Sequence, residues 1–107
     1  MAEDIVVKLS ADLFKTLGHP VRIKILHLLK NGELCVCEMI DKIDIEQSNL
    51  SQHLRMLKKQ GLIDSRKNGQ WVIYWITYPL VIDLLNTAEE LLGKQINDSQ
   101  SLLKFLK

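Results

Sequence analysis

The sequence of 107 residues is long enough for one hydrophobic core, and we expect residues 1–107 to form a single domain. Its composition (47% apolar, 25% charged, net charge +1) is typical of globular proteins and excludes an intrinsically disordered chain. The acidic start Met-Ala-Glu-Asp-Ile does not resemble a signal peptide, and no apolar run approaches the roughly 18 residues of a membrane span. We therefore expect a cytoplasmic protein with no membrane partner.

Three helices are predicted in the first half of the chain. Residues 4–17 carry apolar side chains at helical spacing and end at Gly18, and Pro20 suits the first turn of a second helix that runs to about Lys30. Gly32 then provides a left-handed cap. A third helix, about 33–43, is expected to bury Val36, Met39, Ile40 and Ile43.

The second half predicts a fourth helix, a hairpin and a fifth helix. Residues 47–60 form a helix with one leucine face (Leu50, Leu54 and Leu57) and one polar face. Two runs typical of strands, Leu62–Lys67 and Trp71–Thr77, follow it, and the Asn68-Gly69 pair between them predicts a tight turn in which both residues have positive φ.

A last helix is expected over about 79–95, and its wide apolar stripe indicates a partner subunit. The tail 96–107 could add further helical turns through Leu102, Leu103, Phe105 and Leu106.

This order of elements is that of a winged helix-turn-helix: a mainly α fold with a small β-hairpin wing. The polar face of helix 47–60 would then enter the major groove of DNA, where amide, hydroxyl and guanidinium groups can bind base edges or phosphates. The wing would contact the DNA backbone or the minor groove. The candidate DNA-binding residues are Gln47, Ser48, Asn49, Ser51, Gln52, His53, Arg55, Arg66, Lys67, Asn68 and Gln70.

The distribution of charge supports this interpretation. Residues 53–78 contain five basic residues and one acidic residue (net +4), whereas residues 1–52 carry −2 and residues 79–107 carry −1. The alternative is an exposed polar helix with no ligand. His53 lies at the inner edge of its helix, so a hydrogen-bonded boundary position is the alternative to a DNA contact.

Cys35 and Cys37 form the second candidate site. Two cysteines this close in a reducing compartment more often bind metal or perform redox chemistry than build a disulfide framework, although small buried core residues are the alternative. On a regular helix their side chains would point about 200° apart, so a shared ion would have to distort the helix. Soft thiolates select As(III), Sb(III) or soft divalent metals such as Cd(II), Pb(II), Hg(II) and Zn(II).

From about Leu13 to Thr77 the sequence resembles the ArsR/SmtB family of metal-responsive repressors. The resemblance is carried by Leu13–Arg22, by Glu33-Leu34-Cys35-Val36-Cys37-Glu38, by Gln47–Arg55 and by Gly69–Tyr74. It implies a homodimer built on the first and last helices, which binds an inverted repeat in double-stranded operator DNA and is released by an inducer. It also implies that the cysteine box is the metal-sensing box.

The sequence departs from several patterns of that family. Ile40 stands where some arsenic sensors have a third cysteine, residues 1–12 contain no cysteine, and only Asp83 fits the zinc site of the last helix. Two thiolates therefore remain, completed by a small-molecule thiol, water, Glu38 or the other subunit. We expect no permanent cofactor and an arsenite-type or antimonite-type inducer. The alternatives are sensing of Cd, Pb or Zn, and thiol oxidation.

A thiol enzyme is disfavoured because no βαβ pattern surrounds the cysteines and no His/Asp arrangement indicates another reaction. A winged-helix dimer that recognises proteins, or a repressor switched by a small organic ligand, is a further alternative.

Overall fold

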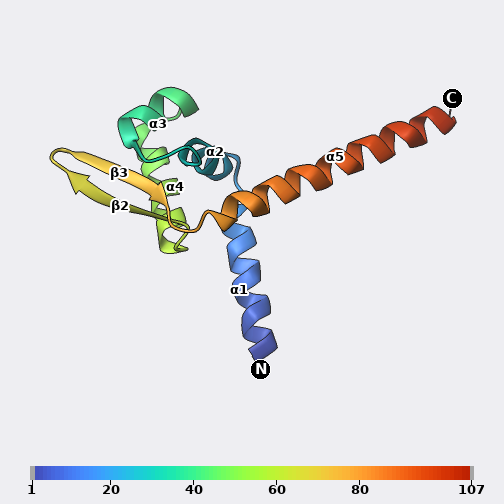
Figure 1. Ribbon diagram of the computed structural model, residues 1–107, viewed down its shortest axis with the longest axis horizontal. Coiled ribbons are helices and arrows are strands. Elements are labelled where there is room, and N and C mark those ends of the chain that lie inside the picture. The colour runs from blue at the N-terminus through green and yellow to red at the C-terminus, as the bar shows by residue number, and fades with distance from the viewer. Residues whose placement is uncertain (1, 107) are drawn as a thin grey trace.

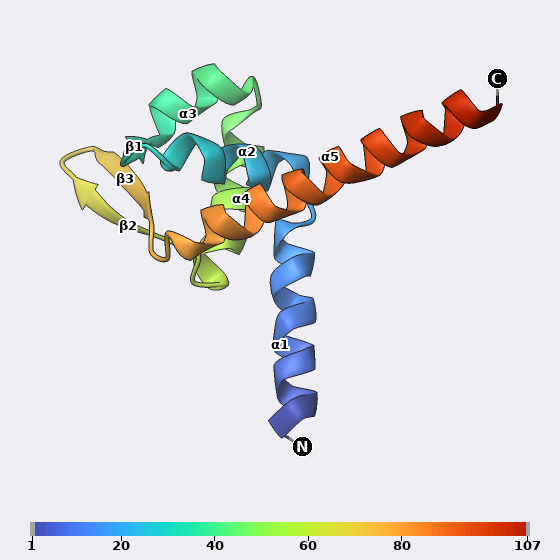
Figure 2. The same ribbon diagram turned by 45° about the vertical axis from the view of Figure 1, so that its right-hand side comes forward.

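A computed structural model of the protein describes residues 2–106, with side chains described up to residue 100. Within this range, helices and strands follow in the order α1 (Ala2–Leu17), α2 (Pro20–Leu29), β1 (Leu34–Cys35), α3 (Val36–Ile43), α4 (Gln47–Lys59), β2 (Ile63–Asn68), β3 (Trp71–Ile76) and α5 (Leu80–Leu106). The sheet and the three short helices form a compact centre, from which α1 and α5 extend (Figures 1 and 2). The predicted winged helix-turn-helix is confirmed.

The start of α2 illustrates how the sequence sets the helix ends. His19 is extended (φ −139°) and caps the helix, because its Nδ1 accepts a hydrogen bond from the backbone N–H of Val21 at 3.2 Å. Pro20 follows in the first turn, where it has no N–H to leave unpaired. Between α3 and α4, Asp44 adopts the left-handed conformation (φ 57°) that ends α3. The first of these residue pairs marks the turn from α1 into α2, and Asp44 marks the turn from α3 into α4.

The wing belongs to a three-stranded antiparallel sheet with the strand order β1-β3-β2. In β1, Leu34 pairs with Tyr74 and Cys35 pairs with Ile73. The sequence pattern predicted that these two residues of β1 belong to the third helix, which is wrong, since α3 begins only at Val36. A two-residue strand is too short to show any periodicity, and it forms because β3 supplies its hydrogen-bonding partners.

The turn of the wing differs by one residue from the prediction. Asn68 and Trp71 form the last cross-strand pair, so Gly69 and Gln70 make the two-residue turn. Among the described residues of this turn only Gly69 has positive φ (67°). A glycine at the first central position followed by negative φ is typical of a type II′ turn, whereas the expected Asn-Gly turn needs positive φ twice.

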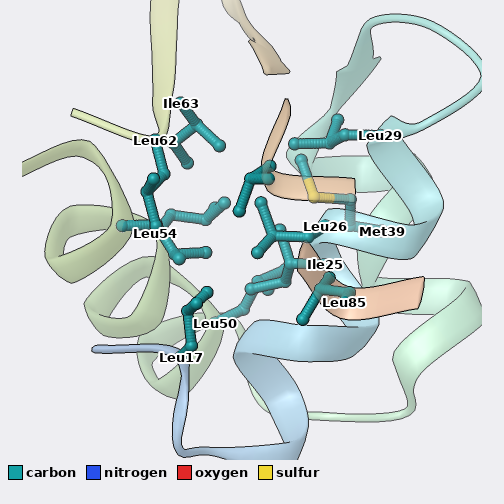
Figure 3. Packing of buried hydrophobic residues seen from close by; sticks show 12 residues of the cluster. Leu17, Ile25, Leu26, Leu29, Met39, Leu50, Leu54, Leu62, Ile63 and Leu85 are labelled. Atoms are coloured by element: carbon teal, nitrogen blue, oxygen red, sulfur yellow. The ribbon is translucent and has the colours of Figure 1, made fainter. Parts of the chain in front are cut away.

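The core lies between α2, α4, the sheet and the start of α5. Leu50, Leu54 and Leu57, the leucine face of α4, are completely buried. Figure 3 shows Leu50 and Leu54 pointing towards Ile25 and Leu26 of α2. The predicted apolar face of the third helix is partly confirmed: Met39 is fully buried, while Val36, Ile40 and Ile43 are half-buried around it. The packing therefore holds the opposite, polar face of α4 towards solvent.

Helices α1 and α5 carry apolar side chains that the chain itself does not cover. Val6 is 61% exposed and Leu92 is 55% exposed, and Leu9, Leu91 and Ile96 are similarly open. The backbone of α5 is helical through most of the tail, but the side chains of Leu102, Leu103, Phe105 and Leu106 lie outside the described residues. No helix in the described part of the chain combines the length and hydropathy needed to cross a membrane.

Candidate DNA-binding surface and cysteine pair

Helix α4 presents one polar face to solvent. Gln47, Ser48, Asn49, Gln52 and Arg55 are exposed, and Ser51 is half-buried. All six belong to the predicted DNA-binding set, and they lie together because the leucine face opposite them is anchored in the core. An exposed helix face of amides, hydroxyls and one guanidinium can bind base edges in a major groove.

His53 lies on the same helix but does not share that surface. It is half-buried, and its Nδ1 accepts a hydrogen bond from Arg22 Nε at 3.2 Å. Its ring centroid lies 4.2 Å from that of His19. Burial lowers the pKa of His53, and the charges of His19 and Arg22 lower it further. The structure thus places His53 at the contact between α4 and α2, as the boundary interpretation expected.

In the wing, Lys67, Asn68 and Gln70 are exposed at or beside the turn, whereas Arg66 is already engaged. The guanidinium of Arg66 donates two hydrogen bonds to the carboxylate of Glu33, at 2.7 and 2.8 Å, and lies 5.3 Å from the ring of Trp75. The Arg66 hydrogen bond lowers the pKa of Glu33, so the carboxylate stays ionised at neutral pH. This bridge was not predicted from the sequence, because 33 residues separate the partners and no strand was expected at β1.

The cysteine pair spans the junction between β1 and α3. Cys35 is buried and is the residue that precedes the first turn of α3, with extended backbone (φ −85°, ψ 164°), while Cys37 is exposed in that first turn. Their Cα atoms lie 5.4 Å apart and their sulfur atoms are joined in a disulfide. The expectation that a helix would hold the side chains about 200° apart is therefore wrong, since only Cys37 lies within the helix. The two sulfurs meet without any bending of α3.

The surroundings of the pair supply little beyond the two sulfurs. Glu38, a proposed third ligand, accepts a hydrogen bond from the backbone N–H of Cys35 through Oε1 at 3.1 Å. Among the residues with described side chains, no group of three His, Cys, Asp or Glu residues is arranged to hold a metal ion. Once the disulfide is reduced, the pair would offer two thiolates to a soft ion, and the remaining ligands would have to come from elsewhere.

A cavity of about 260 Å³ lies between Cys37 and two of the candidate DNA-binding residues, Gln47 and Gln70. Cys37 and Ile40 of α3 line one side, Gln47 of α4 lines another, and Gln70 and Trp71 of the wing close it. A group bound to Cys37 would therefore adjoin both the first residue of α4 and the turn of the wing.

The fold, the exposed polar helix and the basic wing define a winged-helix transcription regulator that binds DNA, not an enzyme. Residues 19–65 match the model of a family described as bacterial regulatory proteins, arsR family. The chain is also 39% identical to Rv0081 from Mycobacterium tuberculosis, whose crystal structure superposes with a TM-score of 0.79 and covers 87% of this chain and 94% of that one. The protein belongs to the arsR family.

Two further relatives have names that state a function. The cadmium resistance transcriptional regulatory protein CadC of Listeria innocua is 40% identical over 85 residues, which are 75% of this chain and 71% of that protein. The arsenical resistance operon repressor of Staphylococcus xylosus is 32% identical over 84 residues, 73% of this chain and 81% of that protein. The chain is therefore a repressor-type regulator of a family that includes regulators of arsenical and cadmium resistance.

Proposed function

We propose that the protein represses an operon by binding operator DNA through α4 and the wing, and that a thiophilic metalloid bound by Cys35 and Cys37 releases it. Arsenite and antimonite are the proposed inducers. The observation that carries this proposal is the cavity in which Cys37 lies beside Gln47 and Gln70. A ligand on the cysteine pair would then compete for the space in which the recognition helix and the wing approach DNA.

The proposed DNA contacts divide by chemistry. The exposed face of α4 binds base edges in the major groove, while Lys67 and Asn68 of the wing bind the backbone, which carries no sequence information directly. Two such helices in a homodimer would meet an inverted repeat with half-sites one helical turn apart, roughly 34 Å. The exposed apolar faces of α1 and α5 are the proposed dimer interface, because the chain itself leaves them uncovered. The two helices that carry them project from the centre of the fold (Figure 2).

Metalloid binding requires the reduced form of the pair. A low-molecular-weight thiol compound reduces the disulfide by exchange: two of its thiols become a disulfide, and Cys35 and Cys37 become thiols. Arsenite, As(OH)₃, then exchanges two hydroxyl groups for the two cysteine sulfurs and releases two water molecules. The third position on arsenic keeps a hydroxyl group, or takes a further small-molecule thiol or a residue of the second subunit.

The proposed route from the cysteines to the DNA runs through the sheet. Cys35 pairs with Ile73 of the wing, and Glu33, two residues earlier, binds Arg66 of the wing. A ligand that draws the two sulfurs into a new geometry would shift β1, and the segment Glu33–Cys35 is joined to the wing by both the strand pairing and the Glu33–Arg66 contact. This replaces the helix distortion expected from the sequence, because Cys35 does not lie in a helix.

A second candidate is release by oxidation. The disulfide favours this candidate, because it shows that this fold accommodates the oxidised form of Cys35 and Cys37. In that case the dithiol form would hold the operator and the disulfide form would release it, with a metalloid playing no part.

Operator titrations with Cys35→Ser and Cys37→Ser proteins test both candidates. Serine keeps the size of the side chain and removes the soft ligand, so we expect both variants to bind DNA and to ignore arsenite. Reduced wild-type protein should lose roughly 5- to 150-fold in affinity on adding arsenite, a range typical of linked binding sites. Val36→Ala, which keeps both sulfurs, is the matched control and should still respond.

Each outcome of these titrations has a defined meaning. If arsenite still releases both serine variants, the inducer binds elsewhere and the proposed site is wrong. If an oxidant releases wild-type protein and arsenite does not, the redox alternative is correct. If cadmium acts and arsenite does not, the site is right and the proposed inducer is wrong.

A further inference from the structure

A polar cluster holds the recognition helix α4 against the start of α2. Arg22 donates to His53 Nδ1 through Nε, and through Nη1 it donates to the backbone oxygen of Thr16 at 3.2 Å. The single proton of the buried Thr16 hydroxyl is shared between two acceptors: the backbone oxygen of Asp12 at 3.1 Å and Oε1 of Gln60, the residue that caps the C-terminus of α4, at 3.2 Å. Helix α4 is therefore hydrogen-bonded at its middle, through His53, and at its end, through Gln60. Arg22 takes part in both contacts, directly with His53 and through Thr16 with Gln60.

The hydrogen bonds of this cluster fix the protonation state of two histidines. An arginine side chain stays protonated in proteins and has no acceptor atom, so His53 can accept from Arg22 only when its Nδ1 carries no proton. The same holds for His19, whose Nδ1 accepts from the backbone N–H of Val21. Both imidazoles therefore carry their single proton on Nε2. Protonation of either Nδ1 would set an N–H group against another N–H group.

The charges around the cluster also oppose protonation. An open cavity of about 590 Å³ adjoins it, and the charged or titratable groups that line this cavity are Asp12 and Lys15 of α1, His19 and Arg22 at the start of α2, and Lys59 of α4. Asp12 is thus the one carboxylate among the residues that line this cavity, and the other charged or titratable groups there are basic. An additional positive charge on His53 would lie within ring contact of His19 and hydrogen-bond distance of Arg22.

We propose that His53 is a proton-sensitive positioning residue, which holds α4 in its DNA-binding orientation when neutral and frees it when protonated. The proposal rests on the proposed role of α4 in binding DNA. The expected direction of the pH effect on DNA affinity is unusual, because an imidazolium near DNA ordinarily strengthens binding by attracting phosphate. Here acidification should weaken binding, since it breaks the tie between α4 and α2.

The experiment measures affinity at pH 7.5 and pH 5.5 for a duplex that the protein itself has selected from a random-sequence pool at pH 7.5. The redox state of the cysteines is kept constant. Wild-type protein should bind about tenfold more weakly at pH 5.5, the loss expected when one hydrogen bond to a charged group is broken. In His53→Gln, whose amide oxygen accepts from Arg22 but does not titrate, the ratio of the two affinities should approach one.

His27→Gln is the matched control. His27 joins α2 to Glu89 of α5 at 2.9 Å, a contact that protonation strengthens, and it lies outside the cluster. This variant should keep the wild-type ratio. Wild-type binding that is equal or tighter at pH 5.5 overturns the proposal, and so does an unchanged ratio in His53→Gln.

An NMR titration of the histidine rings in wild-type protein keeps the proposal testable if His53→Gln does not fold. His53 should be the Nε2–H tautomer at pH 7.5 and should titrate below the ordinary pKa of a histidine side chain. Titration of His53 at or above that ordinary value overturns the proposal. Absence of DNA binding at pH 7.5 would instead refute the proposed function, a result distinguishable from both.

Discussion

Replacing Glu33 with glutamine should make the protein bind DNA more tightly. In the wild-type protein both hydrogen bonds from the guanidinium of Arg66 end on the Glu33 carboxylate, and the lowered pKa of Glu33 keeps that carboxylate charged. Glutamine keeps the size of the side chain and removes the charge. Arg66, one residue from Lys67 in the wing, then becomes available to a phosphate.

The size of the effect follows from counterion release. One additional phosphate contact steepens the dependence of log K on log salt concentration by about 0.9, which corresponds to roughly a threefold gain for a fourfold fall in salt. Fluorescence anisotropy titrations from 50 to 200 mM salt measure both quantities. The gain should vanish in the Glu33→Gln/Arg66→Gln double variant. An unchanged slope in Glu33→Gln, or a gain that survives the loss of Arg66, would refute the reasoning.

Two further predictions concern the DNA contacts and the dimer. Gln52→Ala should relax base preference, at a cost of about 1–3 kcal/mol for the lost base contact, whereas Lys67→Ala should weaken all sequences alike and flatten the salt dependence. The affinities of both variants for a set of operator duplexes with single base changes test this. If Lys67→Ala changed the base preference and Gln52→Ala did not, the assignment of α4 to the major groove would be wrong. Leu91→Asp should produce a monomer in sedimentation experiments, since it places a charge on the exposed apolar face of α5. Asn86→Asp, which adds the same charge on the opposite, polar side of the helix, is the matched control. A dimer that withstands Leu91→Asp would place the interface elsewhere.

The sequence predicted the helices well because their signals are local. Gly18 and Pro20 mark the end of α1 and the start of α2, and the leucine spacing of α4 identifies its buried face without reference to any other element. The exposed side of α4 follows from the same spacing. Most of the candidate DNA-binding surface could therefore be assigned residue by residue.

The errors share a different physical origin. Strand β1 exists only because β3 pairs with it, and the position of Cys35 outside α3 is a consequence of that pairing. The Glu33–Arg66 bridge and the Arg22–His53 bond join residues more than 30 positions apart, so no local pattern reports them. The turn at Gly69 shifted by one residue because the cross-strand register, set along the whole hairpin, outweighed the Asn-Gly preference.

In the proposed homodimer, operator binding depends on the concentration of the protein. The exposed apolar side chains of α1 and α5 would be buried only when two chains associate, so the stability of these helices and the formation of the dimer that spans two half-sites would be coupled. Occupancy of an operator would then rise with roughly the square of the chain concentration while most chains are unassociated. A cell that halves the synthesis of this chain would lose more than half of its repression, and the thermal midpoint of the purified protein would rise on concentrating it.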